Sequence, residues 1–306
     1  MATTVFATRP TQRAARHAPA AEASAGSALR LTLPIAVLAS FGSLAGLLFQ
    51  DAIYGRETAA WAAQSVGQDI ANLLAFPAMV VAALLAGRGS FPAYLVWMGL
   101  LVYSAYTYAI YSFSVHFGPL FLVWVAVFGL SVYVLVGAFA RLHPLLQRPV
   151  ARTGAEKLGA RLLIAIGSGF GVLWLSEVVP AMLSGTTPEA LREVGLLTNP
   201  VHVLDLALLL PAVVLAGALL RKGRPLGYVL APVLLVATFF LGLGIVSLTL
   251  VSAARDLDAA PVVAFAVGTL AALEAFAARS LLKKTSDRWP ELRGDAVPST
   301  DHGRWQ

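Results

Sequence analysis

Residues 93–140 read AYLVWMGLLVYSAYTYAIYSFSVHFGPLFLVWVAVFGLSVYVLVGAFA, and this stretch decides the fold. It holds two apolar runs, 93–113 and 119–140, separated by a short polar turn, and it contains no Asp, Glu, Lys or Arg. A bilayer core about 30 Å thick is crossed by roughly 20 apolar residues in a helix. Because the backbone must satisfy its own hydrogen bonds in lipid, each run is predicted to be a membrane-spanning helix.

The same pattern continues on both sides of this stretch. Six further apolar runs cover residues 31–49, 70–87, 162–183, 201–220, 226–252 and 261–282. The chain is 58% hydrophobic and 12% charged, whereas soluble proteins carry about 25% charged residues. This composition excludes a soluble enzyme and an ordinary nucleic-acid-binding module. The absence of cysteine excludes a disulfide framework and a thiolate metal site. The predicted fold is therefore an all-α, multi-pass membrane bundle of eight transmembrane helices.

The distribution of basic residues predicts the orientation of this bundle. Only three of the 22 Lys and Arg residues lie in the predicted outer connections between spans, namely Arg56, Arg192 and Arg255. The rest lie in segments 1–30, 88–92, 141–161, 221–225 and 279–306. Basic residues concentrate on the cytoplasmic side of membrane proteins. We therefore expect a plasma-membrane protein with both termini in the cytoplasm, whose basic residues orient the chain rather than bind nucleic acid.

This topology divides the chain into five parts. They are a disordered basic arm (1–30), a first four-helix half (31–140), a basic cytoplasmic loop (141–161), a second four-helix half (162–282) and a cytoplasmic tail (283–306). The Ala- and Arg-rich arm also has the composition of an organellar transit peptide, and this alternative stays open. The expected partner is the lipid bilayer, with cytoplasmic contacts through the basic loop and the tail.

An internal similarity relates the two halves. Residues 76–101, FPAMVVAALLAGRGSFPAYLVWMGLL, align without gaps with residues 210–235, LPAVVLAGALLRKGRPLGYVLAPVLL. The alignment matches Pro77 with Pro211 and Gly89 with Gly223. Both halves would enter the membrane from the cytoplasm, which predicts a parallel four-plus-four repeat related by an axis along the membrane normal. In proteins built from such repeats, the binding site commonly lies where the halves meet.

Three acids, Glu177, Asp205 and Glu274, lie within the predicted spans, whereas no Lys or Arg does. An ionisable group at membrane depth costs about 2.5–3.5 kcal/mol on insertion scales, so each acid requires an explanation. Glu177 and Asp205 each lie about four residues from the outer end of consecutive antiparallel spans and therefore share a depth. His202 precedes Asp205 by three residues and lies on the same helix face. Glu274 is closer to the inner end, where it could pair with a basic group at the inner surface.

Further polar residues gather at the same outer level. The candidate substrate- or ion-binding set is Glu177, His202, Asp205, Asp69, His116, Tyr106, Tyr108 and Tyr111. Structural alternatives exist for several members. Asp69 could cap the second span, His202 could reach the lipid headgroups, and the tyrosines could form an aromatic belt. No metal-binding, nucleophile or phosphate-loop motif is present, so no metal, catalytic residue or cofactor is assigned.

Several short motifs give the chain a family resemblance. They are Gln68-Asp69, Arg88-Gly89-Ser90, Tyr106-x-Tyr108-x-x-Tyr111, the run FGPLFL at 117–122, the run NPVHVLD at 199–205 and the run PLGY at 225–228. Together they resemble a family of polytopic prokaryotic integral membrane proteins that is described without an assigned activity. The resemblance implies a membrane location and carries no functional residues.

Three functions are compatible with these features. The first is a transporter or channel-like protein that moves a proton, a metal cation or a small solute by means of the outer acid, His and Tyr cluster. The second is a non-catalytic membrane sensor or assembly factor. The third is an intramembrane enzyme that acts on a lipid, with His202 and an acid as its acid and base. A cavity open alternately to both faces of the membrane would favour transport, one open sideways to lipid with a bound metal would favour the enzyme, and a solid core would favour the sensor.

Overall fold

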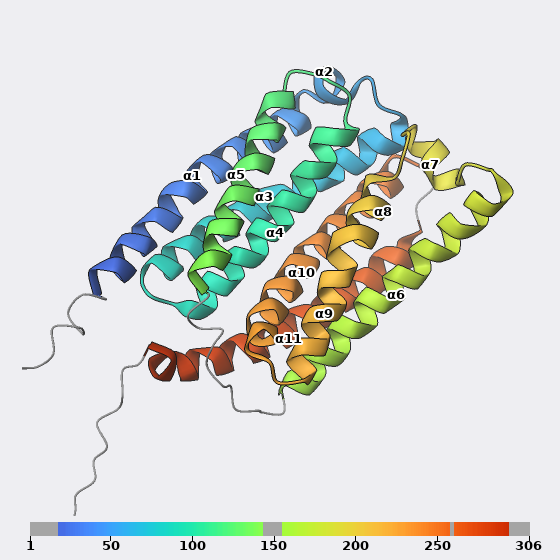
Figure 1. Cartoon of the computed structure of the whole chain (residues 1–306). Coiled ribbons are helices and arrows are strands. Elements are labelled where there is room, and N and C mark those ends of the chain that lie inside the picture. Colours follow the sequence, from blue (N-terminus) through green and yellow to red (C-terminus); the bar gives the residue numbers. More distant parts are fainter. Residues whose placement is uncertain (1–17, 143–154, 258–259, 294–306) are drawn as a thin grey trace, which may run out of the picture.

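A computed structural model describes residues 18–142, 155–257 and 260–293, and it is entirely helical over these ranges (Figure 1). Eight of its helical segments are long and apolar enough to cross a membrane, which confirms the predicted all-α, multi-pass class. They are α1 (Ala18–Leu48), α3 (Ala59–Gly87), α4 (Phe91–Ser114), α5 (Phe121–Leu142), α6 (Ala155–Ser184), the segment α8–η2–α9 (Pro200–Leu204, Asp205–Leu209, Leu210–Arg221), α10 (Pro225–Ala254) and α11 (Pro261–Arg293). Two short helices, α2 (Gln50–Tyr54) and α7 (Glu189–Val194), lie at one end of the bundle.

Two helices begin more than ten residues earlier than their apolar runs predict. Helix α3 begins at Ala59, where the Thr58 hydroxyl caps it by accepting a hydrogen bond from Trp61 N at 3.2 Å. Polar residues in its first turns lower the local hydropathy, although several of them are buried inside the protein. Helix α1 begins at Ala18, so residues 18–30 are helical rather than disordered, as their alanine content favours. Residues 1–17 of the predicted arm lie outside the described ranges.

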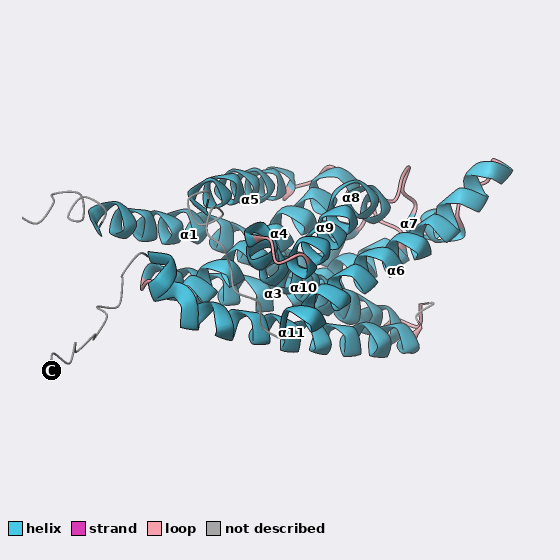
Figure 2. Ribbon diagram, turned by 60° about the horizontal axis from the view of Figure 1, so that its bottom comes forward, coloured by secondary structure: helices cyan, strands magenta, loops and turns pink. Residues whose placement is uncertain are grey.

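The eight segments form two groups of four. In the first group α3 packs against α1 and α4, and α5 packs against α1 and α4. In the second group, the α8–η2–α9 segment packs against α6 and α10, and α11 packs against α6 and α10. Figure 2 shows α3, α4 and α10 in the middle of the molecule, with α5 and α11 on opposite sides. Helix α10 packs on both α3 and α4, and this contact joins the two groups.

Glycines line the seam between the groups. A Cβ atom on Gly67 of α3 would overlap the Leu248 backbone of α10, and one on Gly99 of α4 would lie 2.6 Å from the Val233 carbonyl oxygen. On the other side of the seam, a Cβ on Gly244 would lie 2.7 Å from Gln68 Oε1. Small residues permit this close backbone approach between membrane helices. The seam is therefore tightly packed along α3, α4 and α10.

The two aligned turns have the same local structure. Gly89 and Gly223 both adopt a positive φ, 91° and 70° respectively, which glycine reaches without a steric penalty. Ser90 N donates to Leu85 O at 3.1 Å in the first turn. In the second, Arg224 N donates to Leu219 O at 3.0 Å. Each turn thus ends one helix with the same hydrogen-bonding pattern and starts the next at the aligned residue.

Candidate functional site

A cavity of about 160 Å³ lies between the two groups of helices. Residues from α3, α4, α6, α8–η2–α9, α10 and α11 line it, so both halves contribute to its wall. Most of the wall is aliphatic or aromatic, and its two acids are Asp205 and Glu274. No Lys, Arg or His lines this cavity. The cavity therefore combines an apolar wall with acids that have no basic neighbour in that wall.

Asp205 lines the cavity and lies in an irregular turn of helix. Residues Asp205–Leu209 form a π-helical turn in which Leu210 N donates to Asp205 O. Single π turns of this kind are frequent at functional sites. The Asp205 carboxyl accepts hydrogen bonds from Trp174 Nε1 at 2.7 Å and from the Tyr106 hydroxyl at 2.8 Å. These neutral donors, one from each half, hold a carboxyl group that is only 6% exposed.

His202 and Glu177 form a second pair beside Asp205. His202 Nε2 lies 3.7 Å from Glu177 Oε2, and the His202 ring lies against the Trp174 ring with centroids 4.5 Å apart. His202 is buried, whereas the Glu177 side chain is 33% exposed. Neither residue lines the cavity. The structure thus brings the predicted trio together, but only Asp205 reaches the cavity.

Glu274 occupies the cavity wall on α11. It is 2% exposed, and Thr238 of α10 lines the same cavity, where its hydroxyl donates to the Leu234 carbonyl at 2.8 Å. It forms no ion pair with any of the described residues. The expected pairing with a basic residue is therefore wrong for the described part of the chain, because α11 turns Glu274 inward between the helices rather than toward a basic side chain. Glu274 is the cavity acid that sequence reasoning did not place in the site.

Asp69 lies inside the first group of helices, where it is 2% exposed. Its carboxyl accepts hydrogen bonds from the Tyr54 hydroxyl at 2.6 Å and the Tyr111 hydroxyl at 2.9 Å. The alternative that Asp69 caps the second span is wrong, because α3 starts ten residues earlier. Burial, and then the nearby Asp69 carboxyl, raise the pKa of Tyr54 well above its ordinary value, so Tyr54 remains a donor.

A second chain of hydrogen bonds runs from the cavity into the same group of helices. Gln68, which lines the cavity, donates to the Tyr103 hydroxyl at 2.8 Å, and Tyr103 donates to Asn72 Oδ1 at 2.7 Å. Asn72 in turn donates to Ser43 Oγ at 3.0 Å. Buried polar groups that are fully paired in this way fix the positions of the helices that carry them.

The tyrosines of α4 point into the protein rather than into an aromatic belt. Tyr106 contacts Asp205, and Tyr111 contacts Asp69 while also lining the cavity. Tyr108 is fully buried and donates to the Ala39 carbonyl of α1 at 3.2 Å. Tyr108 is therefore a packing and hydrogen-bonding residue of the first group, away from the cavity.

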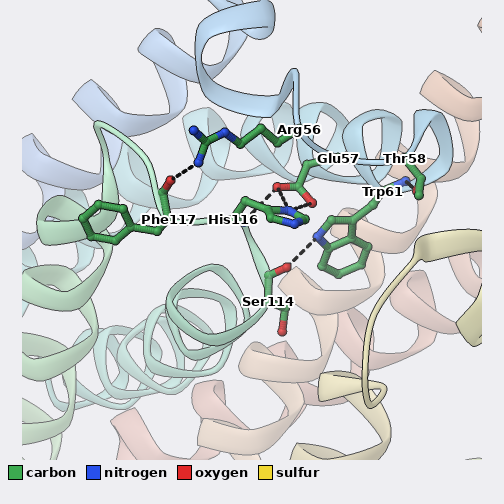
Figure 3. A network of polar contacts seen from close by, with 7 residues as sticks. All are labelled: Arg56, Glu57, Thr58, Trp61, Ser114, His116 and Phe117. Atoms are coloured by element: carbon green, nitrogen blue, oxygen red, sulfur yellow. Dashed lines mark hydrogen bonds and ion pairs between the residues drawn. The ribbon is translucent and has the colours of Figure 1, made fainter.

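His116 lies apart from the other candidates. It is half-exposed in the turn after α4, and its Nδ1 lies 3.0 Å from both carboxylate oxygens of Glu57 (Figure 3). Two neighbouring hydrogen bonds join the same segments, from Arg56 to the Phe117 carbonyl and from the Trp61 indole to the Ser114 carbonyl. This outer clasp (Arg56, Glu57, Trp61, Ser114, His116 and Phe117) fastens the start of α3 to the end of α4.

The described residues contain no group of three or more His, Asp or Glu side chains placed to hold a metal ion. Sequence reasoning also missed Trp174 and Tyr54, the donors to Asp205 and Asp69. A signal for Trp174 existed, because it precedes Glu177 by three residues and so shares its helix face. Tyr54 carried no such signal, since it lies in a short helix outside the apolar runs.

Comparisons with known proteins leave the chain without an assigned relative. No family model, no curated protein and no solved structure matches it. The cavity and its two acids are therefore the features of the molecule that bear on its function.

Proposed function

We propose that this protein is a transporter or channel-like protein that moves a proton, a metal cation or a small solute through the cavity between its two halves. The observation that carries this proposal is the pair of buried acids, Asp205 and Glu274, in a cavity without a basic side chain. Ionisable residues that face the interior of a membrane bundle typically mark substrate or proton pathways. The site is thus centred on the cavity rather than on the outer His202–Glu177 pair.

The position of the two acids also fits passage across the membrane. Pro200 and Pro261 begin the two spans that carry these acids. Asp205 lies five residues after Pro200, and Glu274 lies thirteen residues after Pro261. With a rise of 1.5 Å per residue, the two acids differ in depth by roughly 12 Å. A solute in the cavity would therefore meet one acid toward the outer side and the other toward the inner side.

The proposed internal repeat is consistent with this interpretation. Both halves connect their four segments in the same order of neighbours, and both contain the same turn at Gly89 and Gly223. Gly99 and Val233, which the sequence alignment matches, meet at the crossing of α4 and α10. Contact between matched residues is what a two-fold axis along the membrane normal requires. The proposed parallel repeat therefore places the cavity where its halves meet.

The alternatives fit the geometry less well. A sensor or assembly factor needs no cavity between its halves. A lipid-processing enzyme would pair His202 with Asp205 or Glu177 as acid and base. His202 does lie near Glu177, but neither residue lines the cavity, and Trp174 and Tyr106 hold Asp205. The plasma-membrane location, the cytoplasmic termini and the family resemblance remain predictions. So do cytoplasmic contacts of the basic loop and tail, of which residues 143–154 and 294–306 lie outside the described ranges.

Proteoliposomes provide the test. The full chain is reconstituted in vesicles that contain a pH-sensitive dye, and metal chlorides, ammonium ions, carboxylates and neutral solutes are added in turn, with and without a membrane potential. Internal pH reports proton-coupled movement, and light scattering reports the entry of neutral solutes. We expect at least one condition to give a flux above that of protein-free vesicles, and Asp205→Asn and Glu274→Gln each to lower it by about tenfold or more.

Tyr133→Phe is the matched control, because Tyr133 is 80% exposed on the outer surface of α5. It should transport like the unmodified protein. If no condition gives a flux above protein-free vesicles, or if both acid variants keep full flux, transport through this cavity is refuted and the sensor becomes the leading hypothesis.

A further inference from the structure

We infer that the cavity binds a small organic cation, an amine or quaternary ammonium ion of about the size of one aromatic ring. This inference rests on the proposed function and names the class of solute that the site would carry. It follows from four features of the cavity: the aromatic wall, the volume, the acids and an unpaired hydroxyl group.

Aromatic side chains form much of the cavity wall. Trp61, Tyr106, Tyr111, Phe170 and Trp174 all line it. They come from α3, α4 and α6, so the rings approach the cavity from both groups of helices. A cation over an aromatic face gains about 0.5–2 kcal/mol, with the larger values at desolvated sites, and cages of aromatic rings recognise quaternary ammonium ions. The wall thus favours a cation that is itself partly apolar.

The volume limits the size of this cation. A cavity of about 160 Å³ compares with an engineered cavity of about 150 Å³ that binds benzene. The solute is therefore a compact ion, such as a short alkylammonium or a trimethylammonium group, and not an extended lipid.

The acids supply the charge that such an ion requires. Asp205 and Glu274 are both buried, and the cavity wall has no basic side chain to neutralise either of them. His202, one turn earlier on the same segment, lies 3.7 Å from Glu177 and interacts electrostatically with Asp205 from outside the cavity wall. A buried charge without a partner is costly, so a bound cation would offset that cost.

An inorganic cation fits this wall less well. Metal ions such as Ca²⁺ and Mg²⁺ prefer six or more oxygen ligands at about 2.0–2.6 Å. The described residues include no group of three His, Asp or Glu placed for metal binding, and most of the cavity wall is carbon. An organic cation needs fewer oxygens, because its methyl or methylene groups contact the apolar wall.

Thr107 provides an independent indication of a missing ligand. It is 2% exposed, it lines the cavity, and its Oγ1 has no hydrogen-bond partner within the described part of the chain. A buried polar group without a partner costs roughly 1–3 kcal/mol, so native proteins rarely retain one without a reason. An amine N–H or a hydroxyl group of the solute, such as the hydroxyl of choline, would supply the partner that Thr107 lacks.

Binding of choline to the detergent-purified full chain tests the inference. Choline chloride is titrated at constant ionic strength, with tryptophan fluorescence as the readout because Trp61 and Trp174 line the cavity, and calorimetry confirms the affinity. The uncharged isostere 3,3-dimethylbutan-1-ol is titrated in parallel. We expect saturable choline binding, binding of the isostere that is weaker by about tenfold or more, and a similar loss for choline in Asp205→Asn and Glu274→Gln.

Glu177→Gln is the matched control, since Glu177 lies beside Asp205 but outside the cavity. It should bind choline like the unmodified chain, and all variants are checked for an unchanged melting temperature and elution volume. The inference is overturned if choline does not bind, if the isostere binds equally, or if K⁺ displaces choline at equal concentration. If choline fails while another solute gives an Asp205-dependent flux in proteoliposomes, transport stands and only the organic cation is refuted.

Discussion

Gly46 shows how a single residue makes room for a buried acid. On α1, a Cβ atom at this position would overlap Asp69 Oδ2 and lie 2.7 Å from the Tyr54 hydroxyl. The hydrogen bond between Tyr54 and Asp69 therefore occupies the volume that any larger residue would need. Asp69, Tyr54 and Gly46 thus form one unit, although they lie on three different helices.

Gly46→Ala should consequently destabilise the protein. The added methyl group has to displace the Tyr54 or Asp69 side chain, which strains the packing and breaks a buried hydrogen bond at a cost of about 2 kcal/mol. Thermal unfolding of the purified protein in detergent measures this as a lower melting temperature. Gly42→Ala is the control one turn earlier on α1, because its Cβ would meet Val123 at an ordinary contact distance of 3.6 Å. Equal melting temperatures for the two variants would refute the prediction.

Sequence reasoning at the residue scale identified the acids better than their surroundings. The hydropathy pattern identifies Asp205 and Glu274, because each places a charge within an apolar run. Burial of both side chains follows from the cost of exposing them to lipid. It does not indicate which neighbour holds each acid. Tyr106 and Trp174 reach Asp205 only through the packing of α4 and α6 around the second half, and this packing is not encoded in any local pattern.

The π turn at Asp205–Leu209 is the feature of greatest consequence at the scale of the elements. It adds one residue before Pro211, which has no backbone N–H to continue the regular ladder. Counted from the matched prolines, His202 and Asp205 lie nine and six residues before Pro211. Asp69 and Asn72 lie eight and five residues before Pro77. Allowing for the extra residue, the proposed repeat would match His202 with Asp69 and Asp205 with Asn72.

The gapless sequence alignment instead matches Gln68 with His202, because it assumes the same helical period in both halves. A π turn has no reliable sequence signature, so this local change of register could not be predicted. The turn also rotates everything before it by about 100° relative to a regular helix. It thereby directs Asp205 toward Trp174 and Tyr106.

Deletion of Ala207 tests the role of this turn. Ala207 is exposed on the outer surface, so its removal takes little away from the core while restoring an α-helical register. We expect the deletion to leave Asp205 beside Trp174 and Tyr106 and to keep choline binding, because Asp205 would then lie five residues before Pro211 in a regular helix, as Asn72 lies before Pro77. Ala207→Leu keeps the register and should bind normally. A tenfold loss of choline binding after the deletion would show that the π turn does not simply absorb one extra residue.

At the scale of the whole molecule, composition and run length were sufficient for the eight-helix class. Each apolar run lies in a helix. Lipid offers the backbone N–H and C=O groups no hydrogen-bond partner, so these groups must bond to one another within the run. The cavity was beyond such reasoning, since it depends on how six segments pack around a common space. Only the proposed repeat gave a hint, by indicating that a site would lie between the halves.

The orientation of the whole bundle can be measured with reporters. A reporter fused after Arg152 should be active only on the cytoplasmic side, and one fused near Glu189 only on the outer side. The basic residues of segment 141–161 favour this orientation, and α7, which begins at Glu189, lies at the same end of the bundle as α2. Alkaline phosphatase and green fluorescent protein fusions distinguish the two sides. The opposite result at either position would disprove the eight-span topology with cytoplasmic termini.

The glycine seam restricts how such a molecule could change shape. Along α3, α4 and α10 the backbones approach so closely that parting them would expose glycine-lined backbone to lipid, with nothing to replace the lost contacts. A motion that opens the cavity would therefore have to keep α3, α4 and α10 in contact and rotate the other helices about this seam. The outer clasp at His116 joins α3 to α4, so these two helices would move as one body on one side of the seam. Helix α6, which packs mainly on the α8–η2–α9 segment and lies farther from the seam, would swing toward one face of the membrane or the other.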